Sequence, residues 1–390
     1  MNPTSAEKES PKAIAQEREK AGFPQPAEQL AKPTPEAIAQ EREKAGFPQP
    51  AEQLAKSTPE AIAQERKKTG VCADKPLFTR YSGNPLLTRD KWPYPINSVF
   101  NAGAVLLADG DTLLLCRVED RKGLSHLCAT RSANGLDGWR IDPQPTLMAN
   151  PLDYPEEIWG IEDPRITYVP ELEQYAVVYT SFARGGPGVS LALTKNFRSF
   201  ERYGVIMSPE DKDAALLPWR IGGRWALIHR PMTALGAHMW ISYSPDLRHW
   251  GSHKVILEAR RGGWWDANKI GLCSPPIETA KGWLMIYHGV RQTASGSIYR
   301  LGLAIFDLER PEICLQRGNS WLFGPEASYE RDGDVKDVVF PCGQTIGADG
   351  DTIHLYYGAA DSCVAMATGS IRCLLSWLDA NSSPAETSFS

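Results

Sequence analysis

Apolar residues from about residue 75 onward come in short runs separated by glycine, proline, asparagine and aspartate. Short apolar runs bounded by turn residues are typical of β-strands. Two such runs around a polar turn recur at intervals of about 50–70 residues, in 102–118, 163–182, 213–231, 271–290 and 339–361. The pattern therefore predicts five β-hairpins in one all-β domain.

Regular recurrence of one hairpin indicates a sheet repeated radially, because periods of this length are the mark of propellers and solenoids. The fold class we predict is all-β, a five-bladed β-propeller with a short helical N-terminal repeat extension. Polar turns at 132–139, 194–200 and 244–250 are expected to connect the outer strands of the blades. A β-sandwich is the competing all-β interpretation, which the regular recurrence places second.

The first 70 residues differ in character because they repeat with a period of 24 residues. Each copy reads as a short helix with few strongly apolar residues, and helices of this size are marginal alone. We therefore divide the chain into a helical repeat arm at 1–74, a propeller domain at 75–378 and a disordered tail at 379–390. The arm is either a flexible tether or a device for assembling a homo-oligomer.

Composition restricts the partners that we expect. The 390 residues are 42% hydrophobic and 23% charged, with a net charge of −5 and no dense basic run, which argues against nucleic acid and anionic membranes. No stretch approaches the roughly 18 apolar residues of a membrane span, and the N-terminus lacks a secretory signal, so we expect a cytoplasmic protein. The eight cysteines lack the paired spacing of a zinc site, so we expect free thiols and no metal.

Polar and charged residues collect at one end of the five hairpins. The start of the first strand and the end of the second lie side by side at the open end of a hairpin. Hairpins that point the same way therefore bring their open ends to one mouth of the propeller. These ends carry Asn101, Arg117, Glu119, Asp120, Glu162, Asp163, Lys212, Asp213, His229, Arg230, Lys269, His288 and Asp361.

The mouth mixes groups of two kinds, which together predict a functional site. Its carboxylates can do acid–base work or hold sugar hydroxyls. The cations and donors that can bind an oxyanion such as phosphate are Lys212, Arg230, Lys269, His288, Tyr299 and Arg300. Flat indole faces for carbohydrate rings are offered by Trp159, Trp264 and Trp265. Strand alternation is expected to turn Glu162 away from the side that Asp163 faces.

The order of short motifs along this domain resembles glycoside hydrolase family 130, the five-bladed β-propeller mannoside phosphorylases. The resemblance covers about residues 77–370 and excludes the N-terminal repeats. It rests on WGIEDPRIT (159–167), KDAALLP (212–218), HRP (229–231), SPDLRHWG (244–251), KIG (269–271), GWLMIYHGV (282–290), YRLG (299–302), VVFPCG (338–343) and YYGAAD (356–361).

This resemblance implies an inverting phosphorolysis, in which a β-mannoside and inorganic phosphate give α-mannose 1-phosphate without a cofactor. It implies that Asp163 is the catalytic acid and acts through the 3-hydroxyl of the mannosyl unit. The phosphate-binding positions that it implies are Lys212, Arg230, His288, Tyr299 and Arg300. The positions that it implies for the mannosyl unit are Asn101, Arg117, Glu119, Lys269 and Asp361.

Two other functions remain open from the sequence. A β-mannosidase would need a second carboxylate, Glu119 or Asp361, to activate water, whereas phosphate is already a nucleophile and needs only cations. The retained basic residues favour the phosphorylase. In a non-catalytic carbohydrate-binding propeller, Asp163 would merely pair with Arg165. For the linkage, the stretch 117–127 and the GIEDPR motif resemble members acting on β-1,2-mannosides more than those acting on β-1,4-linkages.

Overall fold

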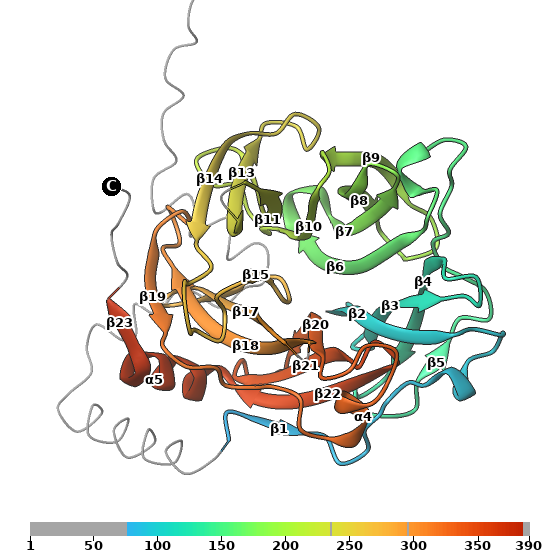
Figure 1. Ribbon diagram of the computed structural model, residues 1–390. Helices are drawn as coiled ribbons and strands as arrows, with labels where there is room; N and C mark the ends of the chain where they lie inside the picture. Colours follow the sequence, from blue (N-terminus) through green and yellow to red (C-terminus); the bar gives the residue numbers. More distant parts are fainter. Residues whose placement is uncertain (1–75, 235, 295, 385–390) are drawn as a thin grey trace, which may run out of the picture. The chain divides into compact units, whose positions relative to one another are not determined.

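The computed structural model describes residues 76–234, 236–294 and 296–384, so the predicted repeat arm lies outside the described residues. Strands dominate, as predicted, and they pair into antiparallel sheets (Figure 1). The helices of this part are short, and they are η3 (Arg89–Lys91), η4 (Pro155–Glu157), η5 (Pro170–Leu172), α4 (Ser328–Arg331) and α5 (Ile371–Asn381).

All five predicted hairpins are present, and each begins one antiparallel sheet. The first sheet contains β2 (Ser98–Leu106), β3 (Thr112–Glu119), β4 (Ser125–Ser132) and β5 (Arg140–Ile141). The second contains β6 (Ile161–Val169), β7 (Gln174–Ala183), β8 (Gly186–Thr194) and β9 (Glu201–Met207). The third contains β10 (Asp211–Leu216), β11 (Trp225–Thr233), β13 (Met239–Ser244) and β14 (Gly251–Leu257).

The fourth and fifth sheets follow the same plan with additions from the chain ends. In the fourth, β15 (Lys269–Leu272) and β16 (Ile277–Thr279) both pair with β17 (Gly282–Thr293), followed by β18 (Gly296–Phe306), β19 (Cys314–Gly318) and β23 (Ser382–Pro384). A short strand, β12 (Gly236–Ala237), joins the third sheet to the fourth. The fifth contains β20 (Val339–Ile346), β21 (Thr352–Ala359), β22 (Cys363–Ser370) and β1 (Phe78–Arg80).

The five sheets pack in a closed ring. A separate cluster of buried apolar side chains fills each space between neighbouring sheets, including the space between the fifth sheet and the first. The first strands of the sheets, β2, β6, β10, β15 and β20, lie around a common centre (Figure 1). The described residues therefore do not form the two face-to-face layers of a β-sandwich.

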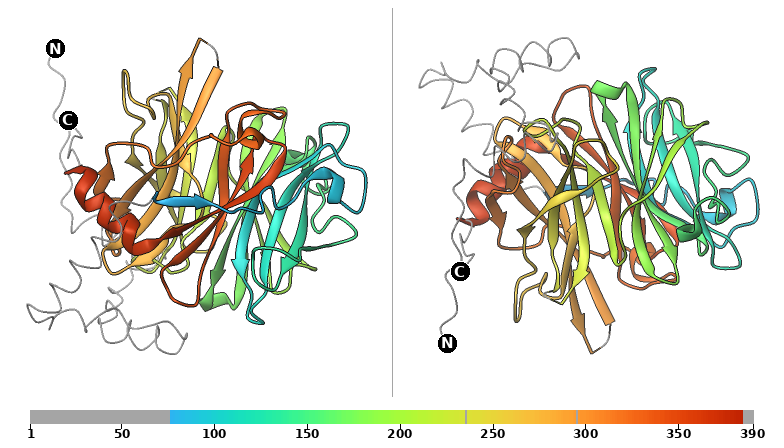
Figure 2. Two further views of the ribbon diagram at one scale, coloured as in Figure 1. Left: turned by 90° about the horizontal axis from the view of Figure 1, so that it is seen from below. Right: turned by 90° about the horizontal axis from the view of Figure 1, so that it is seen from above.

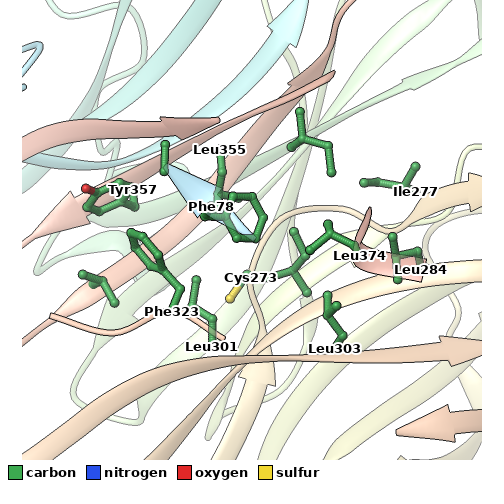
Figure 3. Packing of buried hydrophobic residues seen from close by; sticks show 14 of the residues in the cluster. Phe78, Cys273, Ile277, Leu284, Leu301, Leu303, Phe323, Leu355, Tyr357 and Leu374 are labelled. Carbon is green, nitrogen blue, oxygen red and sulfur yellow. The ribbon is translucent and has the colours of Figure 1, made fainter. Parts of the chain in front are cut away.

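The cluster between the fourth and fifth sheets shows how the chain ends complete this packing. Phe78 of β1 and Leu374 of α5 lie among side chains of both sheets, such as Leu303 and Leu355 (Figure 3). Our prediction of a disordered tail from residue 379 begins too early, because α5 continues to Asn381 and β23 pairs with β19.

The three polar turns between outer strands are closed by the same local hydrogen bonds. The acceptors are the side-chain oxygens of Asn134, Asn196 and Asp246. Each accepts hydrogen bonds from the backbone N–H groups of the residues two and three positions further along the chain. Short side chains of this kind favour turns because they satisfy backbone donors that a strand would leave unpaired. The predicted connections at 132–139, 194–200 and 244–250 are therefore confirmed.

The cysteine prediction holds only in part. Six cysteines are free thiols, at positions 116, 128, 273, 314, 342 and 363. Cys373 is disulfide-bonded, which contradicts our expectation. Scattered spacing could not reveal this bond, because a disulfide depends on which chain segments the fold brings together. No helix in the part of the chain that the structure describes is long and apolar enough to cross a membrane.

Replacing Gly343 by Ala is expected to destabilise the domain by roughly 1–3 kcal/mol, the usual cost of overpacking. A Cβ at Gly343 in β20 would come within 2.2 Å of the backbone nitrogen of Ala104 in β2, where two sheets meet. Urea unfolding would measure the loss. Gly251→Ala is the matched control, since a Cβ there would meet nothing within 4 Å. Equal stability of the two variants would contradict this account of the sheet contact.

Candidate active site

Irregular first strands turn polar side chains toward one another near the centre of the ring. The strand register shifts between Phe100 and Gly103, between Glu162 and Arg165, and between Lys212 and Ala215. A β-bulge of this kind inserts a residue and re-aims a side chain. The residues inside these shifts include Asn101, Asp163 and Asp213, with φ angles of 45°, 50° and 56°. Asn and Asp adopt this left-handed conformation more readily than most residues.

Arg117 of β3 is the centre of the first cluster. Its guanidinium donates hydrogen bonds to Asp163 Oδ1 and Glu162 Oε1, both at 3.1 Å. Its Nε donates to the Ser125 hydroxyl at 2.9 Å, and Glu119 lies 3.8 Å away. Our prediction that Glu162 turns away from Asp163 is therefore wrong, because the register shift in β6 breaks the alternation and lets both carboxylates face Arg117.

Asp163 is buried and held as a carboxylate. The Asn101 side-chain amide donates to Asp163 Oδ1 at 2.9 Å. Burial alone would raise the pKa of Asp163, but the charges of Arg117 and Lys212 outweigh it and lower the pKa. Arg165 contacts only the backbone oxygen of Asp163, at 3.3 Å, and its other hydrogen bonds go to the carbonyls of Cys273 and Leu272. The carboxylate is thus not engaged in the simple Asp163–Arg165 pair of the non-catalytic alternative.

A second cluster surrounds Asp213 and holds most of the predicted phosphate-binding residues. Arg230 donates to Asp213 Oδ2 through Nε at 2.9 Å and Nη2 at 2.7 Å. Arg165 and His288 each lie 3.5 Å from the same carboxylate. Asp213 is a site residue that our prediction placed at the mouth without a role. Its signal was its position beside Lys212, in the first strand of the sheet that follows the sheet of Asp163.

His288 is a buried imidazole with free hydrogen-bonding capacity. Neither ring nitrogen has a hydrogen-bond partner among the described residues. Burial lowers the pKa of His288, the charge of Asp213 opposes this, and the charge of Arg230 adds to it, so that the pKa lies at about 3. The ring packs against Phe340, with centroids 4.8 Å apart, and against Tyr299 at 6.0 Å. A neutral histidine here can donate one hydrogen bond to an anion.

Two lysines supply charge that no carboxylate neutralises through an ion pair within the described ranges. Lys212 lowers the pKa of both Asp163 and Asp213, so its charge reaches both clusters. The Lys269 ammonium lies 5.3 Å from the centre of the Tyr299 ring. An anion placed between the clusters would therefore meet cations whose charge is available.

Asp361 differs from Asp163 in its protonation. Burial and the charge of Asp163 raise the pKa of Asp361 to about 6. Burial also raises the pKa of Glu162. The acidic cluster therefore contains one carboxyl group with a lowered pKa, Asp163, and two with raised pKa values, Glu162 and Asp361.

An Asp361→Asn variant is expected to gain stability over the wild type as the pH rises. The folded pKa of about 6 lies above the ordinary value, so the wild type loses stability as its carboxyl ionises between about pH 4 and pH 6. Asparagine does not titrate, so the gap in unfolding free energy should widen by on the order of 2 kcal/mol. Urea unfolding at pH 4 and pH 7.5 would measure it, with the exposed Asp90→Asn change as control. A constant gap would contradict the raised pKa.

Arg300 does not join the phosphate-binding candidates, contrary to our prediction. Neighbouring residues of β18 face opposite sides of the sheet, and Tyr299 is on the side of His288. The Arg300 guanidinium instead lies 4.6 Å from the centre of the Trp321 ring, on the other side. Among the tryptophans, Trp265 is buried and stacked on Tyr287, which makes it a packing residue. Trp159 and Trp264 are exposed.

A buried hydrogen-bond chain supports the strand that carries Arg230. Asp211 accepts from the backbone N–H of Arg230 at 3.1 Å and contacts His229 Nδ1 at 2.5 Å. His229 Nε2 lies 2.7 Å from the Ser242 hydroxyl, which in turn lies 2.6 Å from His253 Nδ1. Ser242 is fully buried, so this Asp–His–Ser arrangement has no access to a substrate. Across the described residues no group of three potential ligands is placed to hold a metal ion.

A buried carboxylate beside a set of cations, at the centre of a ring of β-sheets, defines a site that can bind an anion next to an acidic group. The family model described as beta-1,4-mannooligosaccharide phosphorylase, of glycoside hydrolase family 130, matches residues 75–380. The chain belongs to this family and is a mannoside phosphorylase, an enzyme of the glycosyltransferase type that uses β-mannooligosaccharides and phosphate.

Similar proteins have both linkage specificities. The beta-1,4-mannooligosaccharide phosphorylase of Ruminococcus albus is 32% identical over 318 residues, which cover 79% of this chain and 93% of that protein. The beta-1,2-mannobiose phosphorylase of Listeria innocua is 36% identical over 254 residues, 64% of this chain and 68% of that protein. A solved structure of a Listeria innocua beta-1,2-mannobiose phosphorylase with beta-1,2-mannobiose has a TM-score of 0.70 at 30% identity, covering 78% of this chain and 99% of that one.

Proposed function

We propose that the ring of sheets is a five-bladed β-propeller and that the enzyme is an inverting phosphorylase of β-1,2-mannosides. In this reaction inorganic phosphate attacks the anomeric carbon of the mannosyl unit, the glycosidic bond breaks, and α-mannose 1-phosphate leaves with a shortened acceptor. The observation that carries the proposal is buried Asp163, held by Asn101 and Arg117, near the charge of Lys212. The charge of Lys212 also reaches Asp213, which Arg230 and His288 contact.

Asp163 is the proton source in this proposal. A proton must reach the glycosidic oxygen as the bond breaks, and the family resemblance routes it through the 3-hydroxyl of the mannosyl unit. In the free protein the charges of Arg117 and Lys212 lower the pKa of Asp163. A phosphate anion bound at Lys212 would offset one of these charges and so raise the pKa. Phosphate binding thereby favours the protonated acid that the reaction needs.

The remaining residues divide between the two substrates. Phosphate is held by Lys212, Arg230, His288 and Tyr299. Hydrogen bonds to a charged group are stronger than those between neutral groups, so these donors suit an anion. The mannosyl unit is held by Asn101, Arg117, Glu119, Lys269 and Asp361. The position of Asn101, which donates directly to Asp163, supports a sugar site next to the acid.

The β-1,2 linkage is supported by the stretch 117–127 and by the GIEDPR motif. Ser125, in this stretch, accepts a hydrogen bond from Arg117, so the stretch reaches the sugar-binding cluster. Relatives with β-1,2 and β-1,4 specificity are about equally similar to this chain, so the family alone does not decide the linkage.

Incubating the enzyme with β-1,2- and β-1,4-mannobiose, each with and without phosphate, tests the proposal. We expect phosphate-dependent release of α-mannose 1-phosphate, faster from the β-1,2-linked substrate. Release of mannose without phosphate would identify a hydrolase instead. A higher rate with β-1,4-mannobiose would overturn the linkage and leave the phosphorolysis standing.

A further inference from the structure

A pocket of about 420 Å³ lies on the side of β17–β18 that faces away from His288 and Tyr299. We call it the arginine–tryptophan pocket, and its lining includes Arg261, Trp264, Arg291, Arg300 and Trp321. The β17–β18 hairpin, which carries Arg291 and leads into Arg300, projects beyond the other strands (Figure 2). The mechanism proposed above uses none of these side chains.

The three arginines of this pocket have no carboxylate partner. No aspartate or glutamate lines the pocket, and none forms an ion pair with Arg261, Arg291 or Arg300 within the described ranges. Arg300 is partly buried, whereas Arg261 and Arg291 are exposed. The other partly or fully buried arginines of the described residues each pair with a carboxylate, as do Arg80, Arg117, Arg165, Arg202, Arg230, Arg260 and Arg317. The unpaired charge of partly buried Arg300 therefore differs from that of these arginines, and Arg261 and Arg291 line the same pocket.

The positive charges also act on one another. Burial lowers the pKa of Arg300, and the charge of Arg291 lowers it further. Like charges brought together destabilise each other, and an anion between them would relieve the repulsion. Guanidinium groups bind phosphate through paired N–H donors, which makes a phosphate group a well-matched ligand.

Two exposed indoles complete the pocket. Trp264 is 43% exposed and Trp321 is 40% exposed. The Arg300 guanidinium lies 4.6 Å from the Trp321 ring centre, and Arg260 lies 4.4 Å from that of Trp264. An indole face can pack against the apolar face of a sugar ring. The pocket thus offers a flat apolar surface beside a cluster of arginine N–H donors that can bind an anion.

We propose that the arginine–tryptophan pocket binds a phosphorylated sugar, with the phosphate on Arg261, Arg291 and Arg300 and the ring against Trp264 or Trp321. It is a second binding site, separated from the catalytic cluster by the β17–β18 sheet. A neutral mannoside could pack against an indole but would leave the three arginines without an anion. The further step, that the ligand is the α-mannose 1-phosphate made by this enzyme, rests on the proposed function.

Calorimetric titration of the full chain with mannose 1-phosphate tests the site. We expect two molecules bound per wild-type chain, one at the catalytic cluster and one at the pocket. The Arg261→Ala/Arg291→Ala variant should bind one, because each lost charge-assisted hydrogen bond weakens binding by roughly tenfold or more. The matched control is Arg198→Ala/Arg310→Ala, which removes two exposed arginines elsewhere and should still bind two. The unfolding temperature of each variant checks that it folds.

The other outcomes separate this proposal from its rivals. One molecule bound to the wild type, or two to the Arg261→Ala/Arg291→Ala variant, would overturn it. Displacement of the second molecule by β-1,2-mannobiose would also overturn it, since the pocket would then recognise a neutral sugar. Titration with mannose 6-phosphate and with inorganic phosphate shows whether the pocket recognises the position of the phosphate on the sugar or the phosphate group alone. Binding at the pocket by an enzyme that releases no mannose 1-phosphate would refute the proposed function alone.

Discussion

An Asp163→Asn variant is expected to lose phosphorolysis by a factor of about 10² to 10⁴ in kcat, the range that a positioned acid contributes. Asparagine keeps the shape and can still hydrogen bond to Asn101, but it cannot deliver a proton to the leaving oxygen. Arg117 retains Glu162 as a partner, so the local structure should survive. Steady-state kinetics with β-1,2-mannobiose and phosphate would measure the loss, and calorimetry should show that the mannoside still binds.

Glu162→Gln is the matched control for this prediction. Glu162 contacts the same arginine at the same distance as Asp163, but only Asp163 is bonded to Asn101. We expect the control to keep most of its activity. Loss of activity in Glu162→Gln with retention in Asp163→Asn would move the proton source to Glu162. Equal turnover in Asp163→Asn and the wild type would refute the acid role.

The hairpins were predictable because their signals are local. Apolar runs and turn residues lie next to each other in the sequence, and the side chains of Asn134, Asn196 and Asp246 close their own turns. The packing between sheets could also be predicted, because each sheet presents apolar side chains to the two sheets beside it. The pairing of β1 with β22 was not predictable, because it joins residues separated by almost the whole domain.

The candidate site was predictable as a set of residues but not as a geometry. Two register shifts decide where Asp163 and Asp213 point, and no periodicity in the sequence marks them. Alternation misplaced Glu162 for this reason. The same rule, correctly applied to the regular strand β18, would have separated Arg300 from Tyr299. Tyr299 and Arg300 are adjacent in one sequence motif, but neighbouring residues of a strand face opposite sides of the sheet.

A His288→Ala variant is expected to raise the KM for phosphate by about 10- to 100-fold, the cost of losing one hydrogen bond to a charged group. The KM for the mannoside should change little, because His288 belongs to the Asp213 cluster and not to the Arg117 cluster. Calorimetry and kinetics at varied phosphate concentration would separate the two constants. His354→Ala, in the fifth sheet, is the matched control.

The pH dependence gives this prediction a second readout. With a pKa near 3, His288 stays neutral from pH 5 to pH 8, so phosphate affinity should show no histidine titration in that range. A step in phosphate KM near pH 6.5 that disappears in His288→Ala would contradict the buried neutral imidazole. A rise in both KM values would instead mean that the variant disturbs the whole site. A selective loss of phosphate binding also separates this enzyme from a hydrolase on the same fold, because water needs neither the cations nor this donor.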